Sequence, residues 1–342
     1  MNIVYLIGNG FDLNLGMRTK YEHFYEYYLS NCEDNDSIHI KNLKEDITKD
    51  KQNWSDLEEA LGRYLNNIGI NEAIMLHSNL IRHLSKYFTS EENKFIFDEK
   101  QNSIFHNYLV YPHLNNRLLF VEKEEIDDNM MKWRGNTWYV DIITFNYTKS
   151  IERLLGYNKD KRTPIGTYIH KNTSYSIILS EIEHIHGFSD ERMILGVNDV
   201  SQIINDKLRN ETRIINRYVK SDCNNTYGWQ HDEKCQKWIN NATLICLFGL
   251  SFGETDKKWW EIIGERLIKG CKIILFEYNS NKQFNGNQGP DIQEEKEKVK
   301  DRFLSKTNID EDLKGEIKNN IYVAYNTDMF KFDIKKKNEN IK

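Results

Sequence analysis

An apolar segment followed by a glycine turn opens the chain and constrains its fold more than any other feature. Ile3–Ile7 is a run of five apolar residues, and Gly8-Asn9-Gly10 follows it directly. Such a run predicts a strand that is buried on both faces, as in a parallel sheet. Two glycines let the backbone turn sharply and approach a ligand, because no Cβ stands in the way. This loop position binds nucleotides in open α/β sheets, although an ordinary tight turn also explains it.

The glycine turn does not by itself complete a phosphate-binding motif. Leu13 stands where the dinucleotide fingerprint has its third glycine, and the chain has no Gly-Lys-Ser/Thr of an NTPase loop. Further strands are expected at Trp138–Ile143, Ser176–Ile182, Met193–Gly196, Thr243–Phe248, Lys272–Phe276 and Ile321–Ala324. Because helical segments separate most of them, we predict an α/β fold with a Rossmann-like, doubly wound and mainly parallel sheet.

The segment after the first strand predicts an insertion. Residues from about 20 to 135 show helical apolar spacing and no strand-like run. We therefore expect a discontinuous Rossmann-like core of residues 1–30 and 136–330, with a helical insertion over 31–135 that covers one side of the sheet. Residues 331–342 are expected to form a charged C-terminal tail.

Composition and charge narrow the classes of partner. The net charge of -5 and the absence of a basic stripe with interleaved aromatics make a nucleic-acid partner unlikely. No apolar run approaches the roughly 20 residues that span a bilayer, so we expect no membrane partner. The five cysteines are scattered without a Cys-x-x-Cys pair. This pattern favours a cytoplasmic location and gives no reason to expect a metal.

Four loops carry the candidate site residues, and each residue has a structural alternative. Asn146 follows the second strand and either binds a ligand or caps the next helix. His186 is favoured over His184 because Gly187 leaves its ring room, although either histidine could be structural. Asp12 either accepts a ribose hydroxyl or holds the first turn. Ser251 could be a helix-entry residue, and the N-cap interpretation of Asp256 is preferred on sequence alone. The remaining segment, Trp54–Glu58, is expected to cap a helix, with a smaller chance that Asp56 or Glu58 reaches the pocket.

Taken together and in order, these segments resemble the AbiH family of bacterial phage-defence (abortive infection) proteins. The resemblance rests on Gly8–Asp12 with Gly16, Thr144–Thr148, His184–Gly187 and Gly249–Asp256, and Trp54–Glu58 also fits. It spans residues 3 to about 278. The four motifs stand in the order that they have in the family, and this order makes the set specific.

The AbiH family in turn is similar to sirtuin-type Rossmann domains, which implies NAD as the substrate. By this resemblance Asn146 would position the attacking water or the nicotinamide ribose, and His186 would be the general base. The implied cofactor-binding residues are Gly8, Asn9, Gly10, Phe11, Asp12, Gly249, Ser251 and Asp256. Asn9 replaces the small residue of the sirtuin loop. The chain has no Cys-x-x-Cys zinc module, so peptide deacetylation is a less favoured outcome than NAD cleavage.

The chemistry of such a site is simple. Cleavage of the nicotinamide–ribose bond passes through an oxocarbenium-like state, as glycoside hydrolysis does. Nicotinamide is a good leaving group, so the protein must mainly orient a nucleophile and accept a proton. We therefore expect an abortive-infection effector that depletes NAD. The alternative is a sensor that binds NAD or ADP-ribose without cleaving it and signals through a partner, either a second copy of the chain or an activating phage or host protein.

Overall fold

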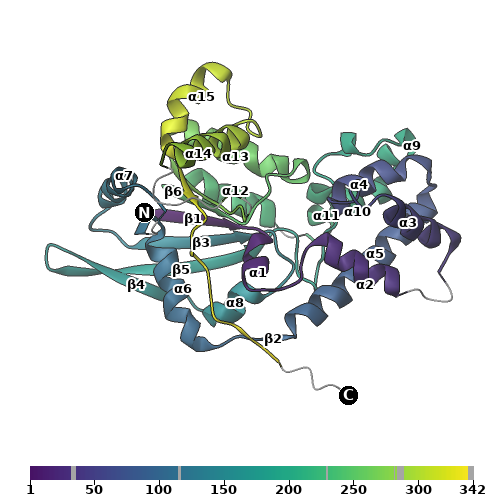
Figure 1. Cartoon of the computed structure of the whole chain (residues 1–342), viewed down its shortest axis with the longest axis horizontal. Helices are drawn as coiled ribbons and strands as arrows, with labels where there is room; N and C mark the ends of the chain where they lie inside the picture. Colours follow the sequence, from purple (N-terminus) through teal and green to yellow (C-terminus); the bar gives the residue numbers. More distant parts are fainter. Residues whose placement is uncertain (32–35, 115–116, 229, 281, 283–288, 338–342) are drawn as a thin grey trace.

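The computed structural model describes residues 1–31, 36–114, 117–228, 230–280, 282 and 289–337, and its centre is a single large sheet (Figure 1). The seven strands of this sheet are β1 (Asn2–Ile7), β3 (Trp138–Thr144), β4 (Thr163–His170), β5 (Thr173–His184), β6 (Leu244–Phe248), β7 (Lys272–Glu277) and β8 (Ile321–Tyr325). Their order across the sheet is β4-β5-β3-β1-β6-β7-β8. The α/β class expected from the sequence is confirmed.

The topology is that of a doubly wound sheet. All neighbouring strands are parallel except β4, which pairs antiparallel with β5 at one edge. Without β4, the strands follow the order 3-2-1-4-5-6 of Rossmann domains, whose ligand crevice lies where the order reverses. Here the reversal falls between β1 and β6. The strand expected at Met193–Gly196 is wrong, because this segment is irregular and only Val197 forms an isolated bridge, to Val219.

Fifteen helices connect or cover the strands in the described residues. They are α1 (Gly10–Asn14), α2 (Tyr21–Ser30), α3 (Ile38–Lys49), α4 (Leu57–Tyr64), α5 (Ile70–Glu92), α6 (Asn102–Val110), α7 (Phe120–Met131), α8 (Ser150–Leu155), α9 (Asp206–Arg209), α10 (Thr212–Tyr218), α11 (Lys220–Thr226), α12 (His231–Asn241), α13 (Lys257–Ile268), α14 (Gly289–Leu304) and α15 (Glu311–Ile317). Two short strands, β2 (Phe95–Ile96) and β9 (Lys335–Lys336), pair separately.

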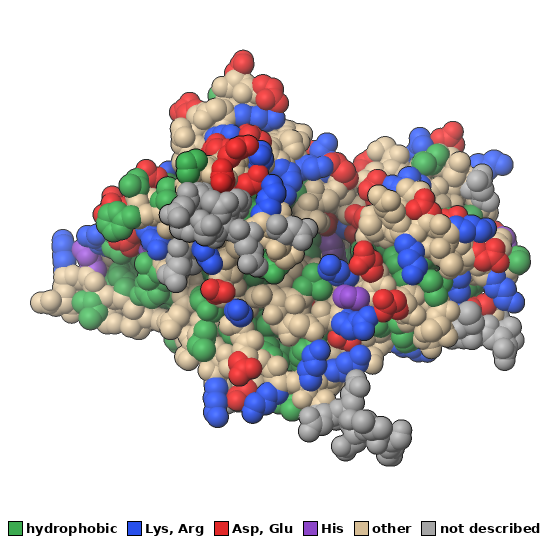
Figure 2. All heavy atoms as spheres, viewed as in Figure 1, with side chains coloured by type: hydrophobic (Ala, Val, Ile, Leu, Met, Phe, Trp, Pro, Cys, Tyr) green, Lys and Arg blue, Asp and Glu red, His purple; other side chains and the backbone are tan. Residues whose placement is uncertain are grey.

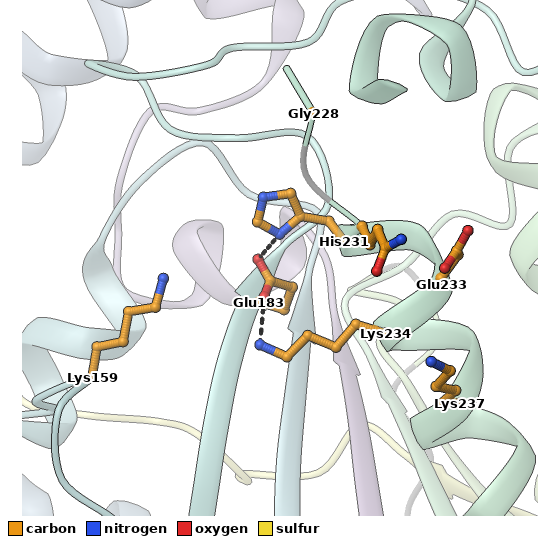
Figure 3. Close-up of a pocket in the computed structure, with 8 residues that line it drawn as sticks. Lys159, Glu183, Gly228, His231, Glu233, Lys234 and Lys237 are labelled. Atoms are coloured by element: carbon orange, nitrogen blue, oxygen red, sulfur yellow. Dashed lines mark hydrogen bonds and ion pairs between the residues drawn. The ribbon is translucent and has the colours of Figure 1, made fainter. Parts of the chain in front are cut away.

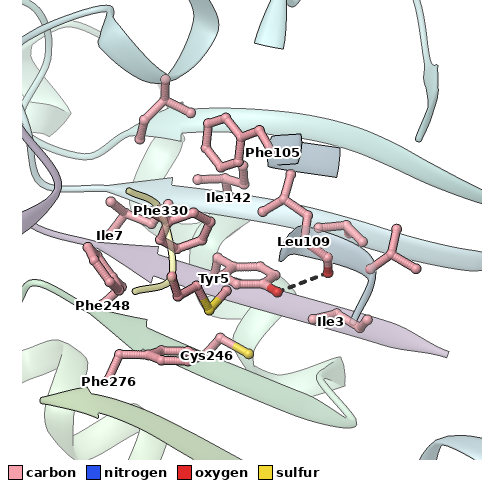
Figure 4. Packing of buried hydrophobic residues seen from close by; sticks show 14 of the residues in the cluster. Ile3, Tyr5, Ile7, Phe105, Leu109, Ile142, Cys246, Phe248, Phe276 and Phe330 are labelled. Carbon is pink, nitrogen blue, oxygen red and sulfur yellow. Dashed lines mark hydrogen bonds between the residues drawn. The ribbon is translucent and has the colours of Figure 1, made fainter. Parts of the chain in front are cut away.

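Strand β1 is buried on both faces, as its apolar run predicts. All five residues of Ile3–Ile7 have no exposed surface. On one face Tyr5 packs near Phe105 and Phe330, and its hydroxyl donates to the carbonyl oxygen of Leu109 at 2.9 Å (Figure 4). Burial of each large apolar side chain contributes about 1.5–3 kcal/mol. The paired hydroxyl avoids the cost of an unsatisfied polar group in this core.

Three hydrophobic clusters organise the helices. Helices α6, α7 and α8 cover the face of the sheet that carries Tyr5, and α12, α13 and α14 cover the opposite face. A third cluster joins α2, α3, α4, α5, α9 and α10 into a helical lobe at the right of Figure 1. The division into a core, a 31–135 insertion and a tail remains a prediction. In the packing observed, α6 and α7 lie on the sheet, whereas α2, α9 and α10 belong to the helical lobe.

The last described residues pack against the body of the protein. Phe330 and Phe332 are buried in the cluster around Tyr5, and Lys335–Lys336 pair with Phe95–Ile96. Residues 338–342 of the expected tail lie outside the described residues. On the face shown in Figure 2, positive and negative side chains are interspersed rather than gathered into one basic stripe. Within the described part of the chain, no helix is both long and apolar enough to cross a membrane.

Candidate functional site

The loops that carry the sequence motifs leave the sheet at the same edge. Ile7, the last residue of β1, is in register with Thr144 of β3 and with Phe248 of β6. Thr144 is in register with His184 at the end of β5. Because these four strands are parallel neighbours, the loops that follow them lie side by side at their carboxyl ends. This edge is the candidate site.

The glycines at the reversal point bring two loops into backbone contact. Gly8 N donates to Phe248 O and Gly10 N donates to Gly249 O, each at 2.9 Å. A Cβ on Gly10 would lie 2.4 Å from Gly249 Cα, and one on Gly8 would lie 2.6 Å from Gly249 O. Gly249 itself has a φ of +67°, which favours glycine. In this structure, therefore, these positions require glycine because a Cβ would prevent the loop after β1 from packing on the loop after β6.

Three other residues of the implied cofactor set have different surroundings. The Asn9 side chain is exposed and exchanges hydrogen bonds with Thr19, whose Oγ1 donates to Asn9 Oδ1 at 2.5 Å. Phe11 is fully buried and stacks on Phe105 at a centroid distance of 5.6 Å. Ser251 is exposed. Thus Asn9 and Ser251 present polar groups to solvent at the site edge, whereas Phe11 belongs to the hydrophobic core.

Asp12 ties the β1 loop to the start of α8. Thr148 Oγ1 and Ser150 Oγ each donate to one of its carboxylate oxygens at 2.6 Å. Its side chain is almost fully buried. Burial raises the pKa of Asp12 to about 6, although the two hydroxyl donors favour the ionised form. Of the two sequence alternatives, the contacts in this structure are those of a residue that holds the first turn.

The two histidines near the end of β5 have different environments. The His184 ring lies between Asn146 O (2.8 Å from Nδ1) and Glu152 Oε1 (2.6 Å from Nε2). Burial lowers the pKa of His184 and the Glu152 carboxylate raises it, and the net direction is upward. The His186 ring instead places Nε2 3.1 Å from Asp256 Oδ1 and lines a hollow at the site. Of the two, His186 is therefore the histidine that faces the hollow.

Asp256 is the centre of a buried charge cluster. Besides His186, its Oδ1 contacts Lys220 Nζ at 2.8 Å, and the same Nζ contacts Glu58 Oε2 at 2.8 Å. Asp256 occupies the N-cap position of α13, but its side chain accepts no capping hydrogen bond. The N-cap position preferred on sequence alone is thus confirmed for the Asp256 backbone, but the prediction that the side chain caps the helix is wrong. Burial raises the pKa of Asp256, yet Lys220 and His186 together lower it well below its usual range, so the carboxylate is ionised.

Glu58 and Lys220 come from elements outside the glycine motifs. Asp56 caps α4 by accepting from Glu58 N and Glu59 N, as expected. The Glu58 side chain contacts Lys220, which lines the hollow, but neither Asp56 nor Glu58 lines the hollow itself. Lys220 is the first residue of α11, and nothing in the sequence marks it. Its burial, with 8% of its surface exposed, is the feature that identifies it, since lysine is almost never buried without a partner.

The Asn146 carboxamide is buried without a hydrogen bond to any described residue. Asn146 is 4% exposed, and neither Oδ1 nor Nδ2 has a partner. Its backbone N donates to Thr144 Oγ1 at 3.1 Å, and α8 begins after Lys149, so the side chain caps no helix. An unsatisfied buried amide costs about 1–3 kcal/mol. Such a cost is expected at a position where a ligand or a water supplies the missing partners.

Most of the residues that line the hollow at the site are polar or charged. The hollow is lined by Ile185, His186, Asn198, Lys220, Ser221, Asn224, Asp232, Thr255, Asp256, Lys258 and Trp259. The Phe145 and Tyr147 rings flank His186, with centroid distances of 5.4 and 6.2 Å, whereas Asn146, which stands between them in the sequence, does not line the hollow. Among the described residues, no group of three or more His, Cys, Asp or Glu side chains is arranged to hold a metal ion.

A family model described as bacteriophage abortive infection AbiH matches residues 4–278 of this chain. The chain belongs to the AbiH family. The match covers most of the chain and includes all four loops of the candidate site. Membership of the family implies a role in phage abortive infection. The comparison with curated proteins gave no match.

Proposed function

We propose that this AbiH-family protein is an abortive-infection effector that hydrolyses the N-glycosidic bond of NAD at a sirtuin-like site built on Asn146 and His186. The observation that carries the proposal is the buried, unpartnered carboxamide of Asn146, whose chain neighbours Phe145 and Tyr147 both pack against the His186 ring. The Rossmann strand order supports it, because that fold places nucleotides at this edge of the sheet.

The proposed reaction uses groups of this chain alone. Water attacks the anomeric carbon as the nicotinamide C–N bond breaks, and nicotinamide leaves with the bonding electrons. The Asn146 carboxamide orients the water or the ribose hydroxyls. His186 takes the proton that the water loses, and ADP-ribose and nicotinamide are the products. The Asp256 carboxylate, 3.1 Å from His186 Nε2, favours the positive charge that develops on the imidazole.

Asp256 has a defined part in this proposal. His186 Nε2 lies 3.1 Å from Asp256 Oδ1 without a hydrogen bond in this structure, and in the proposed reaction it donates to this oxygen, which fixes the ring proton on Nε2 and makes Nδ1 the acceptor. Lys220 keeps Asp256 ionised, which prevents the carboxylate from competing for the proton. Asp256 is thus a positioning residue for His186 rather than a group that touches the reacting atoms.

The test is release of nicotinamide from NAD by the purified full-length chain, alone and with extract of phage-infected cells as a source of activator. We expect Asn146→Ala and His186→Ala each to lower the rate by about a hundred- to ten-thousand-fold. His170→Ala on the β4–β5 hairpin and the exposed Asn241→Ala are matched controls that should keep the wild-type rate. A double Asn146→Ala/His186→Ala variant with wild-type activity would reject the site.

The same assay separates the two candidate functions. Tight binding of NAD or ADP-ribose without turnover, even with infected-cell extract, would select the nucleotide sensor over the hydrolase. The sensor is favoured by the same unpartnered Asn146 amide, since binding alone would satisfy it. A second copy of the chain or a phage or host protein remains the proposed activating partner in either case.

A further inference from the structure

A second hollow lies beside α12. It has a volume of about 530 Å³ and is lined by Lys159, Glu183, Gly228, Gln230, His231, Glu233, Lys234 and Lys237 (Figure 3). We call it the α12 groove. None of these eight residues lines the hollow at His186 and Asp256. The volume falls within the range of about 300–1,000 Å³ that small-molecule sites occupy.

The inner wall of the α12 groove is a fixed polar network. Glu183 near the end of β5 is buried and accepts hydrogen bonds from His231 Nδ1 and from Lys234 Nζ, the second at 3.1 Å (Figure 3). Burial raises the pKa of Glu183, but His231 and Lys234 lower it to a net value below its usual range, so the carboxylate is ionised. This pairing fixes the orientation of the His231 and Lys234 side chains before any ligand arrives.

The outer wall is one face of a helix. Gln230, Glu233, Lys234 and Lys237 follow the i, i+3, i+4, i+7 spacing that brings side chains to one side of α12. Lys159, from the connection between α8 and β4, faces them across the groove (Figure 3). Both Lys159 and Lys237 are exposed.

The charged side chains that line the α12 groove indicate which class of ligand it binds. The lining holds three ammonium groups and two carboxylates, but Lys234 is paired with both Glu183 and Glu181, so the positive charge presented to a ligand comes from Lys159 and Lys237. Glu183 already interacts with His231 and Lys234, which leaves Glu233 as the only lining carboxylate outside this network. Lysine binds phosphate groups as a point charge. The groove is far larger than one phosphate group, and Gln230 and Glu233 can accept hydrogen bonds from ribose hydroxyls.

We propose that the α12 groove is a second ligand site, which binds a phosphorylated small molecule of nucleotide size with its phosphates between Lys159 and Lys237. The site is independent of the proposed NAD chemistry, because it uses none of the residues around His186. A nucleotide and free phosphate share the phosphate chemistry, but only a nucleotide is large enough to gain affinity from the polar inner wall.

The experiment is calorimetric titration of the full-length chain with ADP and, separately, with inorganic phosphate. We expect ADP to bind more tightly than phosphate. Lys237→Glu and Lys159→Glu should each weaken ADP binding by about tenfold, and Lys237→Arg should retain it. Lys41→Glu, an exposed lysine on α3 in the helical lobe, is the matched control and should bind ADP as the wild type does.

Three results would overturn the proposal. The first is absence of ADP binding to the wild-type chain. The second is equal affinity for ADP and inorganic phosphate, which would make the ligand free phosphate. The third is ADP binding that His186→Ala abolishes and Lys237→Glu leaves unchanged, because the nucleotide would then occupy the other hollow. Since binding is measured without turnover, a failure of the proposed NAD hydrolysis leaves this test intact.

Discussion

His186 Nε2 lies 3.1 Å from Asp256 Oδ1, and Lys220 Nζ lies 2.8 Å from the same oxygen. One carboxylate oxygen thus holds an imidazole from the end of β5 and an ammonium group from α11. The ammonium group also contacts Glu58 Oε2 in the helical lobe at 2.8 Å. The sheet and the helical lobe are therefore joined through charged side chains at the edge where nucleotides bind in related folds.

This arrangement predicts that Asp256→Asn damages catalysis more than binding. An amide cannot hold the His186 proton on Nε2 as a carboxylate does, so we expect kcat for NAD hydrolysis to fall about a hundredfold with little change in KM. Asp206→Asn, an exposed residue of α9, should have no effect. Nitrogen NMR of labelled histidines provides a readout that does not need turnover. An unchanged His186 tautomer in Asp256→Asn would contradict the assignment.

Because the Asn146 amide is buried without a partner among the described residues, we expect its removal to cost the protein little stability. Asn146→Ala removes no hydrogen bond to a described residue, so we expect it to cost less than about 1 kcal/mol. Asn224 is equally buried, but it accepts from Arg192 and donates to Ile185 O and Asp232. Asn224→Ala should therefore cost about 2–3 kcal/mol. Urea unfolding of both variants measures the difference, and equal losses would mean that Asn146 has a structural role after all.

Much of the fold was predictable because apolar runs mark buried strands directly. Ile3–Ile7 and Thr243–Phe248 are continuous apolar or β-branched runs, and both form central strands. Met193–Gly196 is similarly apolar and buried but forms no strand, because burial alone does not specify backbone pairing. The edge strand β4 was not expected, since its hairpin with β5 is half exposed and carries no continuous apolar run.

The candidate site was predictable only where a motif marked it. The loops of Asn146, His186 and Asp256 could be placed at one edge because parallel strands share their carboxyl ends. Lys220 could not be found in this way, as it follows an ordinary amphipathic helix and gains its role from tertiary contacts with Glu58 and Asp256. Phe11 illustrates the reverse problem. It stands within a motif, yet its side chain packs into the core.

The buried position of Lys220 predicts strong coupling with Glu58. Lys220→Met would leave two carboxylates buried without their cation, and we expect a loss of about 3–5 kcal/mol in the free energy of unfolding. The double variant Glu58→Gln/Lys220→Met should lose less than the sum of the single variants. The exposed pair Glu59–Arg63 is one residue away and serves as the control, with an expected coupling below about 1 kcal/mol. Equal coupling in both pairs would contradict the buried network.

The loop contact at Gly10 predicts a large effect from a single methyl group. In Gly10→Ala the new Cβ would lie 2.4 Å from Gly249 Cα, so one backbone segment must move, and we expect a loss of about 3 kcal/mol. Gly315 in α15 has open space at the Cβ position. Gly315→Ala should instead gain roughly 0.5–1 kcal/mol, because alanine favours the helix. Thermal unfolding of the two variants in opposite directions would confirm that the glycine turn is required for packing.

The buried carboxylate of Asp12 predicts a pH dependence with a definite sign. Burial raises its pKa in the folded state to about 6, above the ordinary value of 3.8, so the folded protein binds this proton more tightly than the unfolded chain. The contribution of Asp12 to the free energy of unfolding is therefore greatest below about pH 4 and falls as the pH rises toward 6. The difference between these two pKa values corresponds to a loss of roughly 3 kcal/mol in the free energy of unfolding across this pH range.

Asp12→Asn removes this titration while it keeps an acceptor for one of the two hydroxyl groups. Its free energy of unfolding should therefore improve relative to the wild type between pH 4 and pH 7, because only the wild type must ionise a buried group over that interval. Urea titrations at half-unit steps of pH measure the difference directly, and Asp206→Asn corrects for the loss of a surface charge. A difference between Asp12→Asn and the wild type that stays constant over this range would show that Asp12 is already ionised at pH 4, held in that form by the hydroxyl groups of Thr148 and Ser150.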